Sequence, residues 1–229
     1  MTETIPQIID FSSYLILKDP KAVAAAGVKI AYVRQGYGRY WSDAAYPYFH
    51  QELTKVGVDV PLYIMFQPAQ DIDLQLKYAL AAWRPHKAPM AVDVELRHKL
   101  GRVKAGTELW HFCDELEYET KRAPLIYTAP YIFNQYYYDK TFDWQRFPLW
   151  VSDPDPQIKP DLPYAWKEWI LRQYTWKAQI PGIVGSVDGN RPKGTLDEFQ
   201  TLGAAAKPDL SKIDIDDSTI PRCVSRPDG

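Results

Sequence analysis

Cysteine is scarce in this chain, and long apolar runs are missing. Only Cys113 and Cys223 occur among the 229 residues. This count excludes a disulfide framework and a cysteine-rich metal site, and it leaves open a single bridge between the two. The longest apolar stretches, such as 22–27 and 61–66, fall far short of the roughly 18 to 20 residues that span a bilayer. We therefore expect no insertion into a membrane.

The chain also lacks a surplus of charge. Its 27 Lys and Arg residues against 29 Asp and Glu residues give a formal net charge of −2, so nucleic acid is not an expected partner. The first residues have no basic segment followed by an apolar one, which predicts synthesis in the cytoplasm without a signal peptide. The four histidines show no metal-ligand spacing, and we expect neither a metal nor a cofactor.

Two common catalytic motifs are missing as well. No glycine-rich phosphate loop occurs, and Gly36-Tyr-Gly38 is too short to indicate one. No Gly-x-Ser-x-Gly sequence is present, which argues against a serine hydrolase of the α/β type. What the chain does contain is 46% hydrophobic residues, enough for a sizeable core, and an aromatic fraction of 14%. Such rings build cores, and they also form platforms under sugars.

Short apolar runs alternate with helical segments, and this rhythm predicts an α/β fold with parallel strands. The five strands expected in this part cover residues 7–9, 28–33, 61–65, 90–94 and 124–127. Beyond residue 145 three further strands, 149–152, 169–174 and 183–188, have no helical connections. The pattern favours one irregular, TIM-like eight-stranded barrel as a single domain, 1–206. Residues 207–229 are polar and contain proline, so we interpret them as a tail or the stub of a linker.

Local signals place several helix ends. Asp19-Pro20 supplies an N-cap and a first-turn proline, and Ser42 or Asp43 can cap the next helix. Thr195-Leu-Asp-Glu198 is a capping box that predicts a final short helix. In the long helix after residue 100, Cys113 falls on an apolar stripe at helical spacing and is expected in the core.

Four carboxylates occur at the ends of predicted strands: Asp10, Asp93, Glu95 and Asp188. The carboxyl ends of barrel strands are where catalytic groups collect. Asp93 and Glu95 are two residues apart, so an extended strand presents both on one face. Neighbouring carboxyls suit cleavage of a glycosidic bond, because one donates a proton while the other stays ionised. The alternatives are a salt bridge of this pair, for example with Arg97, and turn or cap roles for Asp10 and Asp188.

The order of these segments resembles glycoside hydrolase family 25, the muramidases also called Chalaropsis-type lysozymes, from about residue 7 to 200. Eight segments carry the resemblance: Ile8-Ile-Asp-Phe-Ser-Ser-Tyr14, Tyr46-Pro-Tyr-Phe49, Leu62-Tyr-Ile-Met-Phe-Gln-Pro68, Met90-Ala-Val-Asp-Val-Glu95, Pro124-Leu-Ile-Tyr-Thr128, Pro148-Leu-Trp-Val151, Arg172-Gln-Tyr174 and Pro181-Gly-Ile-Val-Gly-Ser-Val-Asp-Gly-Asn190. Each is weak alone, but their joint order is specific.

The resemblance implies a (β/α)5(β)3 barrel that hydrolyses the β-1,4 bond between N-acetylmuramic acid and N-acetylglucosamine. Glu95 would be the general acid, and Asp93 would hold the 2-acetamido group that acts as neighbouring nucleophile, with retention of configuration. Asp10 and Asp188 would orient the substrate and balance the charge of the site. The residues implied to line the cleft are Tyr63, Tyr127, Trp150, Gln173 and Tyr174, whose alternative role is barrel core.

The implied partner is bacterial peptidoglycan, attacked by a monomer that resembles a phage endolysin or a tail-associated lysin. A glycan-binding module of the same fold, which grips the wall without cutting it, is the alternative function. Two segments depart from the family's pattern. Arg34 to Gly38 lacks the acidic residue usual there, and Ile64 replaces a common histidine. We expect both changes to alter the wall of the cleft near one subsite.

Overall fold

A closed barrel is the centre of the computed structural model, which describes residues 5–38, 41–154 and 159–202. Within these ranges eight strands form the barrel. They are β1 (Ile8–Phe11), β3 (Ile30–Tyr37), β5 (Leu62–Met65), β6 (Ala91–Asp93), β7 (Leu125–Thr128), β8 (Leu149–Ser152), β9 (Leu171–Ala178) and β11 (Val187–Pro192). Two-residue strands lie beside it: β4 (Trp41–Ser42), β2 (Ile16–Leu17) and β10 (Ile183–Val184).

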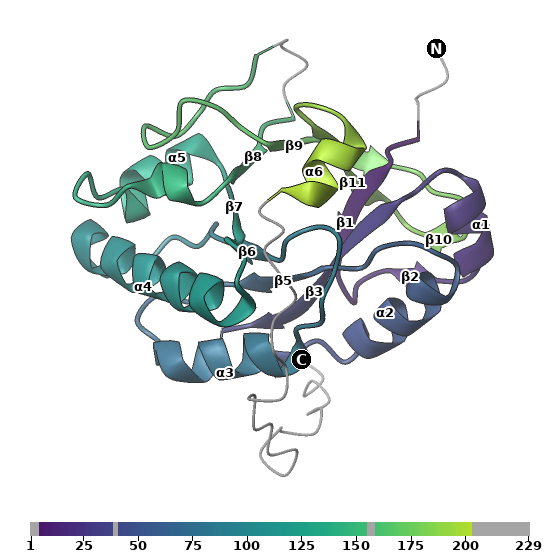
Figure 1. Cartoon of the computed structure of the whole chain (residues 1–229), viewed down its shortest axis with the longest axis horizontal. Coiled ribbons are helices and arrows are strands. Elements are labelled where there is room, and N and C mark those ends of the chain that lie inside the picture. Colours follow the sequence, from purple (N-terminus) through teal and green to yellow (C-terminus); the bar gives the residue numbers. More distant parts are fainter. Residues whose placement is uncertain (1–4, 39–40, 155–158, 203–229) are drawn as a thin grey trace.

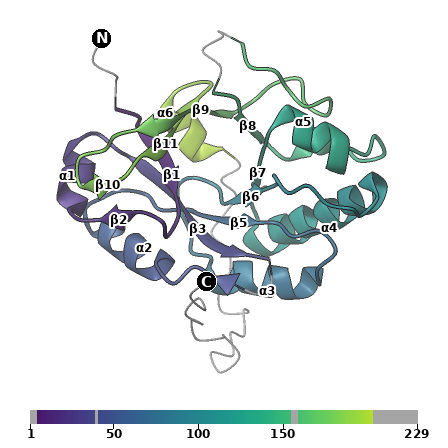
Figure 2. The same cartoon turned by 180° about the vertical axis from the view of Figure 1, so that it is seen from behind.

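Seven of the barrel strands run parallel in the order β1, β3, β5, β6, β7, β8 and β9. Strand β11 is antiparallel to both β9 and β1 and closes the barrel. The helices after the first five strands are α1 (Pro20–Ala25), α2 (Tyr46–Lys55), α3 (Ile72–Ala82), α4 (Arg102–Thr120) and α5 (Pro130–Ile132). Figures 1 and 2 show α1 to α4 outside the strands. The predicted (β/α)5(β)3 arrangement is confirmed.

Most of the predicted helix signals act as expected. The Asp19 side chain accepts hydrogen bonds from the backbone of the first turn of α1. Thr195 and Glu198 form the reciprocal capping box of α6 (Leu196–Thr201). The expected capping of α2 by Ser42 or Asp43 is wrong, because that helix begins at Tyr46 without a side-chain cap. Asp43 lies two residues before the N-cap position, Ala45, and its carboxylate accepts from the backbone N–H of Ala45 and from the buried guanidinium of Arg34 instead of from the first turn of the helix.

One further expectation differs from the structure. The strand predicted over 183–188 is split into β10 and β11, because Gly185 adopts φ +104°, a left-handed conformation that a continuous strand cannot accommodate. After β7 the chain forms α5, which is followed by the π-helical turn η1 (Phe133–Tyr137). A 3-10 turn, η2 (Trp144–Arg146), then leads into β8.

The core has two layers because the strand side chains alternate between the inside and the outside of the barrel. Ile8, Tyr32, Leu125 and Leu171 belong to the inner cluster, which also contains Trp150. The outer cluster lies between strands and helices and contains every second strand residue together with the apolar stripe of α4. Cys113 belongs to this outer layer and is fully buried, as predicted.

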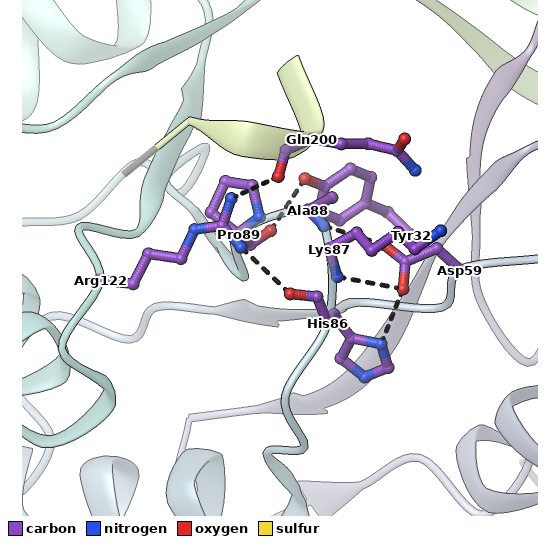
Figure 3. Close-up of polar contacts among 8 residues, drawn as sticks. All are labelled: Tyr32, Asp59, His86, Lys87, Ala88, Pro89, Arg122 and Gln200. Atoms are coloured by element: carbon purple, nitrogen blue, oxygen red, sulfur yellow. Dashed lines mark hydrogen bonds and ion pairs between the residues drawn. The ribbon is translucent and has the colours of Figure 1, made fainter. Parts of the chain in front are cut away.

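Helix α6 is tied to the amino-terminal end of the barrel, opposite the carboxyl ends of the parallel strands. Its Phe199 is buried in the inner cluster. The Arg122 guanidinium donates hydrogen bonds to the carbonyl oxygens of Gln200 (3.0 Å), Leu202 and His86 (3.1 Å). Nearby, the Asp59 carboxylate accepts from the backbone preceding β6, as Figure 3 shows. This end of the barrel is therefore closed by polar contacts and a buried ring.

Some expectations concern residues outside the described ranges. The proposed tail, 207–229, and Cys223 both lie there, so the tail and the possible bridge between Cys113 and Cys223 stay predictions. In the described part of the chain, every helix is too short or too polar to cross a bilayer.

Candidate active site

The four carboxyls predicted from strand ends lie together at the carboxyl-terminal mouth of the barrel. They line one pocket of about 90 Å³. Its lining consists of Asp10, Tyr63, Asp93, Glu95, Tyr127, Trp150 and Asp188. The structure thus brings together side chains that are up to 178 positions apart along the chain, from 10 to 188.

Strand register explains this convergence. Asp10 in β1 lies directly opposite Asp188 in the antiparallel strand β11. Asp93, the last residue of β6, lies level with Tyr127 in β7. Glu95 follows Asp93 by two residues, so its side chain returns to the same pocket. The carboxyl ends of β1 and β6 therefore supply Asp10, Asp93 and Glu95, and the amino-terminal end of the antiparallel strand β11 supplies Asp188 at the same mouth.

A buried amide, Gln173, connects two of these acids. Its Nε2 donates to Asp10 Oδ1 (3.2 Å) and to Asp188 Oδ2 (3.3 Å). Its Oε1 accepts from the hydroxyl of Tyr127 (2.9 Å) and from the indole Nε1 of Trp176 (2.8 Å). Because Gln173 has no exposed surface, these bonds fix its orientation, and its donor end must face the acids.

Asn190 holds Asp10 from the other side. Its Nδ2 donates to Asp10 Oδ1 at 2.7 Å, while its Oδ1 accepts from the indole Nε1 of Trp150 at 2.8 Å. Trp150 is almost fully buried, and its ring packs against Tyr127 and Tyr32. Trp150 therefore forms the floor of the pocket and positions the amide that binds Asp10.

Asp93 and Glu95 differ in exposure and in partners. Asp93 is buried, with 5% of its surface exposed, and its Oδ1 has no hydrogen-bond partner among the described residues. Glu95 is exposed at the mouth of the pocket. The alternative of a salt bridge is wrong for Arg97, whose guanidinium lies over the ring of Tyr131. Within the described ranges neither acid forms an ion pair, so both are available to a ligand.

The pKa values of all four acids are raised, and burial is the largest cause for each. The pKa of Asp10 is raised to about 7 by burial and by the charge of Asp188. That of Asp188 is raised to about 6 by burial and by Glu95. Burial and Glu95 raise the pKa of Asp93 well above its usual range. The pKa of Glu95 is raised by burial against the pocket wall. The site therefore retains protons near neutral pH.

The charge of Arg34 acts against the raised pKa values of two of these acids. Its positive charge lowers the pKa of both Asp93 and Glu95. The guanidinium is itself held by Asp43, with Nε and Oδ2 separated by 3.4 Å, and it lies over the ring of Tyr14. One departure from the family's pattern, the segment starting at Arg34, is thus close enough to the acids to affect their charge.

The predicted lining residues fall into three groups. Tyr63, Tyr127 and Trp150 line the pocket, and Gln173 binds its acids. Tyr174 is not brought into the pocket, since Arg191 covers its ring on another part of the strand surface. The expectation that Ile64 alters the cleft wall is wrong. Its side chain is fully buried in the outer layer, because Tyr63 faces inward and successive strand residues alternate.

Two residues of the site were not singled out from the sequence. Asn190 follows Asp188 by two positions, and this spacing on a strand is a signal that could have indicated a shared face. Trp176 gave no such signal, because irregular pairing between β9 and β11 interrupts the alternation. Its ring is 52% exposed beside Gln173, a flat apolar surface next to the pocket that suits a sugar ring.

The chemistry of the pocket is that of an acid site with aromatic walls. No group of three or more His, Cys, Asp or Glu side chains in the described ranges has an arrangement that holds a metal ion. The phenols of Tyr63 and Tyr127 stay protonated, because burial raises both pKa values well above the usual range. An exposed carboxyl, a buried carboxyl and two phenol donors can bind a polyhydroxylated ligand and transfer a proton to it.

Comparison with known sequences assigns a family to this arrangement. Residues 9–183 match the model described as Glycosyl hydrolases family 25. A protein of Escherichia coli strain K12, described as uncharacterized protein YegX, is 25% identical over 180 residues. That alignment covers 76% of this chain and 63% of YegX, so this chain spans under two thirds of the relative's length.

Solved structures with the same fold come from bacteria, fungi and a phage. The bacterial lysozyme of Streptomyces coelicolor superimposes with a TM-score of 0.76 at 21% identity, covering 89% of this chain and 98% of that one. The muramidase of Acremonium alcalophilum gives 0.74 at 23% identity, covering 87% and 98%. The catalytic domain of endolysin ply40 from Listeria monocytogenes bacteriophage P40 gives 0.67 at 21% identity, covering 88% and 99%.

Proposed function

The chain belongs to glycosyl hydrolases family 25, and from this premise we propose that it is an N-acetylmuramidase acting on bacterial peptidoglycan. The substrate bond is the β-1,4 linkage between N-acetylmuramic acid and N-acetylglucosamine. The observation that carries the proposal is the convergence of Asp10, Asp93, Glu95 and Asp188 on one pocket. Glycan binding alone does not require a proton donor with a raised pKa, whereas glycosidic cleavage does.

Glu95 is proposed as the general acid. It is the one acid of the four that is exposed at the mouth, where a glycosidic oxygen can approach it. Its pKa is raised by burial against the pocket wall, so part of the population is protonated above the range of an ordinary glutamate. Exposure to the ligand together with retention of a proton is the combination that an acid catalyst needs.

Asp93 is proposed to hold the 2-acetamido group of the muramic acid residue. It is buried below Glu95, and its Oδ1 lacks a partner among the described residues. An acetamido N–H would satisfy that oxygen and favour the ionised carboxylate, which in turn makes the acetamido oxygen more nucleophilic. Asp10 and Asp188, held by Gln173, would orient the sugar and balance the charge of the site.

The reaction then has two steps. First, the acetamido oxygen bonds to C1 of the muramic acid residue, the bond from C1 to the leaving oxygen breaks, and Glu95 donates its proton to that oxygen. Second, water attacks C1, the Glu95 carboxylate accepts the water's proton, and the acetamido group is restored. Two displacements at C1 give retention of configuration. Because the substrate supplies the nucleophile, the usual carboxyl spacing of retaining enzymes does not apply.

The first test is the substitution Glu95→Gln, which keeps the size of the side chain but cannot donate a proton as a carboxylic acid does. We expect kcat on purified cell walls to fall by about 10²- to 10⁴-fold. The readout is loss of wall turbidity together with new reducing ends. Glu115→Gln, an exposed change on the outer helix α4, is the matched control. A Glu95→Gln protein as active as the parent would disprove the assignment.

Mass spectrometry of the digest identifies the bond. Muramic acid at the new reducing ends is the expected product, and N-acetylglucosamine there would contradict muramidase activity. Wall co-sedimentation without any product would instead favour the glycan-binding module. We further propose the bacterial cell wall as the place of action, in the manner of an endolysin or tail-associated lysin. The likeness of fold to the endolysin of phage P40 supports this proposal.

A further inference from the structure

A second pocket lies outside the barrel, between helices α2 and α3 and beside the end of β3. Its volume is about 300 Å³, larger than the pocket with the four acids. The side chains that decide its chemistry are Gln35, Tyr46, His50 and Tyr78, with Ala81 and Ala82 on the apolar wall. A volume of this size is at the lower end of the range for small-molecule sites. The pocket can therefore hold about one sugar ring.

Three polar atoms of the side chains that line this pocket are buried without a hydrogen-bond partner among the described residues. They are Gln35 Oε1, the Tyr46 hydroxyl and His50 Nε2. Gln35 and Tyr46 expose only 3% and 6% of their surfaces. The Gln35 amide is oriented by its Nε2, which donates to Ser42 Oγ at 3.2 Å and leaves the carbonyl oxygen for a donor. Buried polar atoms are nearly always paired, so three unpaired atoms on side chains around one pocket make it a candidate ligand site.

The charged groups around the pocket are already engaged. The Asp43 carboxylate accepts from Arg34 Nε and from the backbone N–H groups of Ser13 and Ala45. The guanidinium of Arg84 donates to two backbone carbonyls at the end of α3. His50 is neutral at neutral pH, because burial and the nearby charge of His86 lower its pKa. The unsatisfied groups are thus a neutral amide oxygen, a phenol and a neutral imidazole.

We propose that this pocket is a second, non-catalytic saccharide site that binds an N-acetylated sugar through its acetamido group. The amide N–H supplies the donor that Gln35 Oε1 lacks, and the amide oxygen can accept from the Tyr46 hydroxyl. A ring hydroxyl can pair with His50 Nε2, and the acetyl methyl fits the apolar wall formed by Ala81, Ala82 and Tyr78. A sugar without the acetamido group satisfies fewer of these atoms. This inference goes beyond the proposed function and does not depend on catalysis.

The second pocket is separate from the catalytic cleft. One ion pair connects a residue that lines the second pocket with a residue whose charge acts on the cleft. Asp43 lines the second pocket, and its carboxylate binds Arg34, whose charge acts on Asp93 and Glu95. Gln35, the next residue along β3, lines the second pocket instead of the first. A sugar bound there therefore contacts the strand that supplies Arg34 without touching the acids.

The test is an NMR titration of the Glu95→Gln protein with N-acetylglucosamine, so that hydrolysis plays no part. The His50 ring signals report the second pocket, and the Trp176 indole N–H signal reports the cleft. We expect the His50 signals to shift with N-acetylglucosamine and to stay unchanged with glucose. Tyr46→Phe, which removes only an unpaired hydroxyl and should fold as stably as the parent, should weaken this binding about five- to tenfold.

Two further variants complete the test. Tyr48→Phe makes the same chemical change on the same helix at a half-exposed residue outside the pocket, and it should leave the affinity unchanged. Ala82→Leu fills the pocket and should abolish the His50 response. The proposal is overturned if only the Trp176 signal moves, if glucose binds equally well, or if Tyr46→Phe binds as tightly as the parent. Each outcome is independent of whether the wild-type protein cuts peptidoglycan.

Discussion

Replacing Asp188 by Asn should stabilise the protein at alkaline pH while leaving its stability at acid pH almost unchanged. The reason is the raised pKa of this acid, about 6 in the folded protein against an ordinary value of 3.8, caused by burial and by Glu95. Between these values the folded state binds more protons than the unfolded state. The free energy of unfolding therefore falls as the pH rises from about 4 to above 6.

The size of the effect follows from the shift. A difference of about two pKa units corresponds to about 3 kcal/mol at pH values above the folded pKa. Asp188 is only partly buried, so solvent screening reduces this to about 1–2 kcal/mol. Asn retains the oxygen that accepts from Gln173 Nε2, so this hydrogen bond contributes equally to the stability of the parent and of the variant. Loss of the Asp188 charge also lowers the pKa of Asp10, which adds to the gain.

The measurement is urea denaturation of both proteins at pH 4 and at pH 8. We expect the free energy of unfolding of Asp188→Asn to exceed that of the parent by about 1–2 kcal/mol at pH 8 and to equal it at pH 4. The control is Asp73→Asn, an exposed change in the first turn of α3. It shows how much of the change in the free energy of unfolding results from removing any one negative charge. An equal difference at both pH values, or a loss at pH 8, would refute the reasoning.

Two more predictions concern opposite ends of the barrel. Arg122→Met removes the donors that bind the carbonyls of Gln200, Leu202 and His86, and it should lower the free energy of unfolding by about 2–3 kcal/mol with kcat unchanged. Chemical denaturation measures the free energy of unfolding, and loss of wall turbidity measures kcat. Unchanged stability would contradict the role of Arg122. Trp176→Ala removes the half-exposed ring beside Gln173 and should raise KM about fivefold, since stacking on an aromatic face contributes about 1 kcal/mol. A change in kcat alone would contradict that role.

The alternation of short apolar runs with helical segments was enough to predict the barrel and to single out the acids of the site. Ile8, Tyr32 and Leu125 fall on alternating positions of short apolar runs, and such runs form strands wherever helices cover them. Asp10, Asp93 and Glu95 stand at the ends of such runs, and parallel strands bring their carboxyl ends to one mouth. Asp188 joins them from the start of the antiparallel strand β11. The family resemblance supplied their roles, which stay proposals.

Errors arose where a contact distant in the sequence decides the local structure. Asp43 is a good cap by composition, yet the guanidinium of Arg34 binds its carboxylate across the pairing of β3 with β4. Ile64 was placed on the cleft wall although its register points it outward, and Trp176 reaches Gln173 only because β9 and β11 pair irregularly. Propensity and spacing do not record which side of a strand faces the barrel axis.

The sequence by itself determined the number of strands in the barrel, the helices between them and which acids stand at strand ends, because these depend on periodicity and on residues adjacent along the chain. Only the tertiary structure decided how protons are shared among the acids and where polar atoms remain unpaired. The pKa of Asp10 depends on Asp188, which lies 178 residues away, and the second pocket depends on how α2 packs against α3. Burial and charge are properties of neighbours in space, and folding alone defines those neighbours.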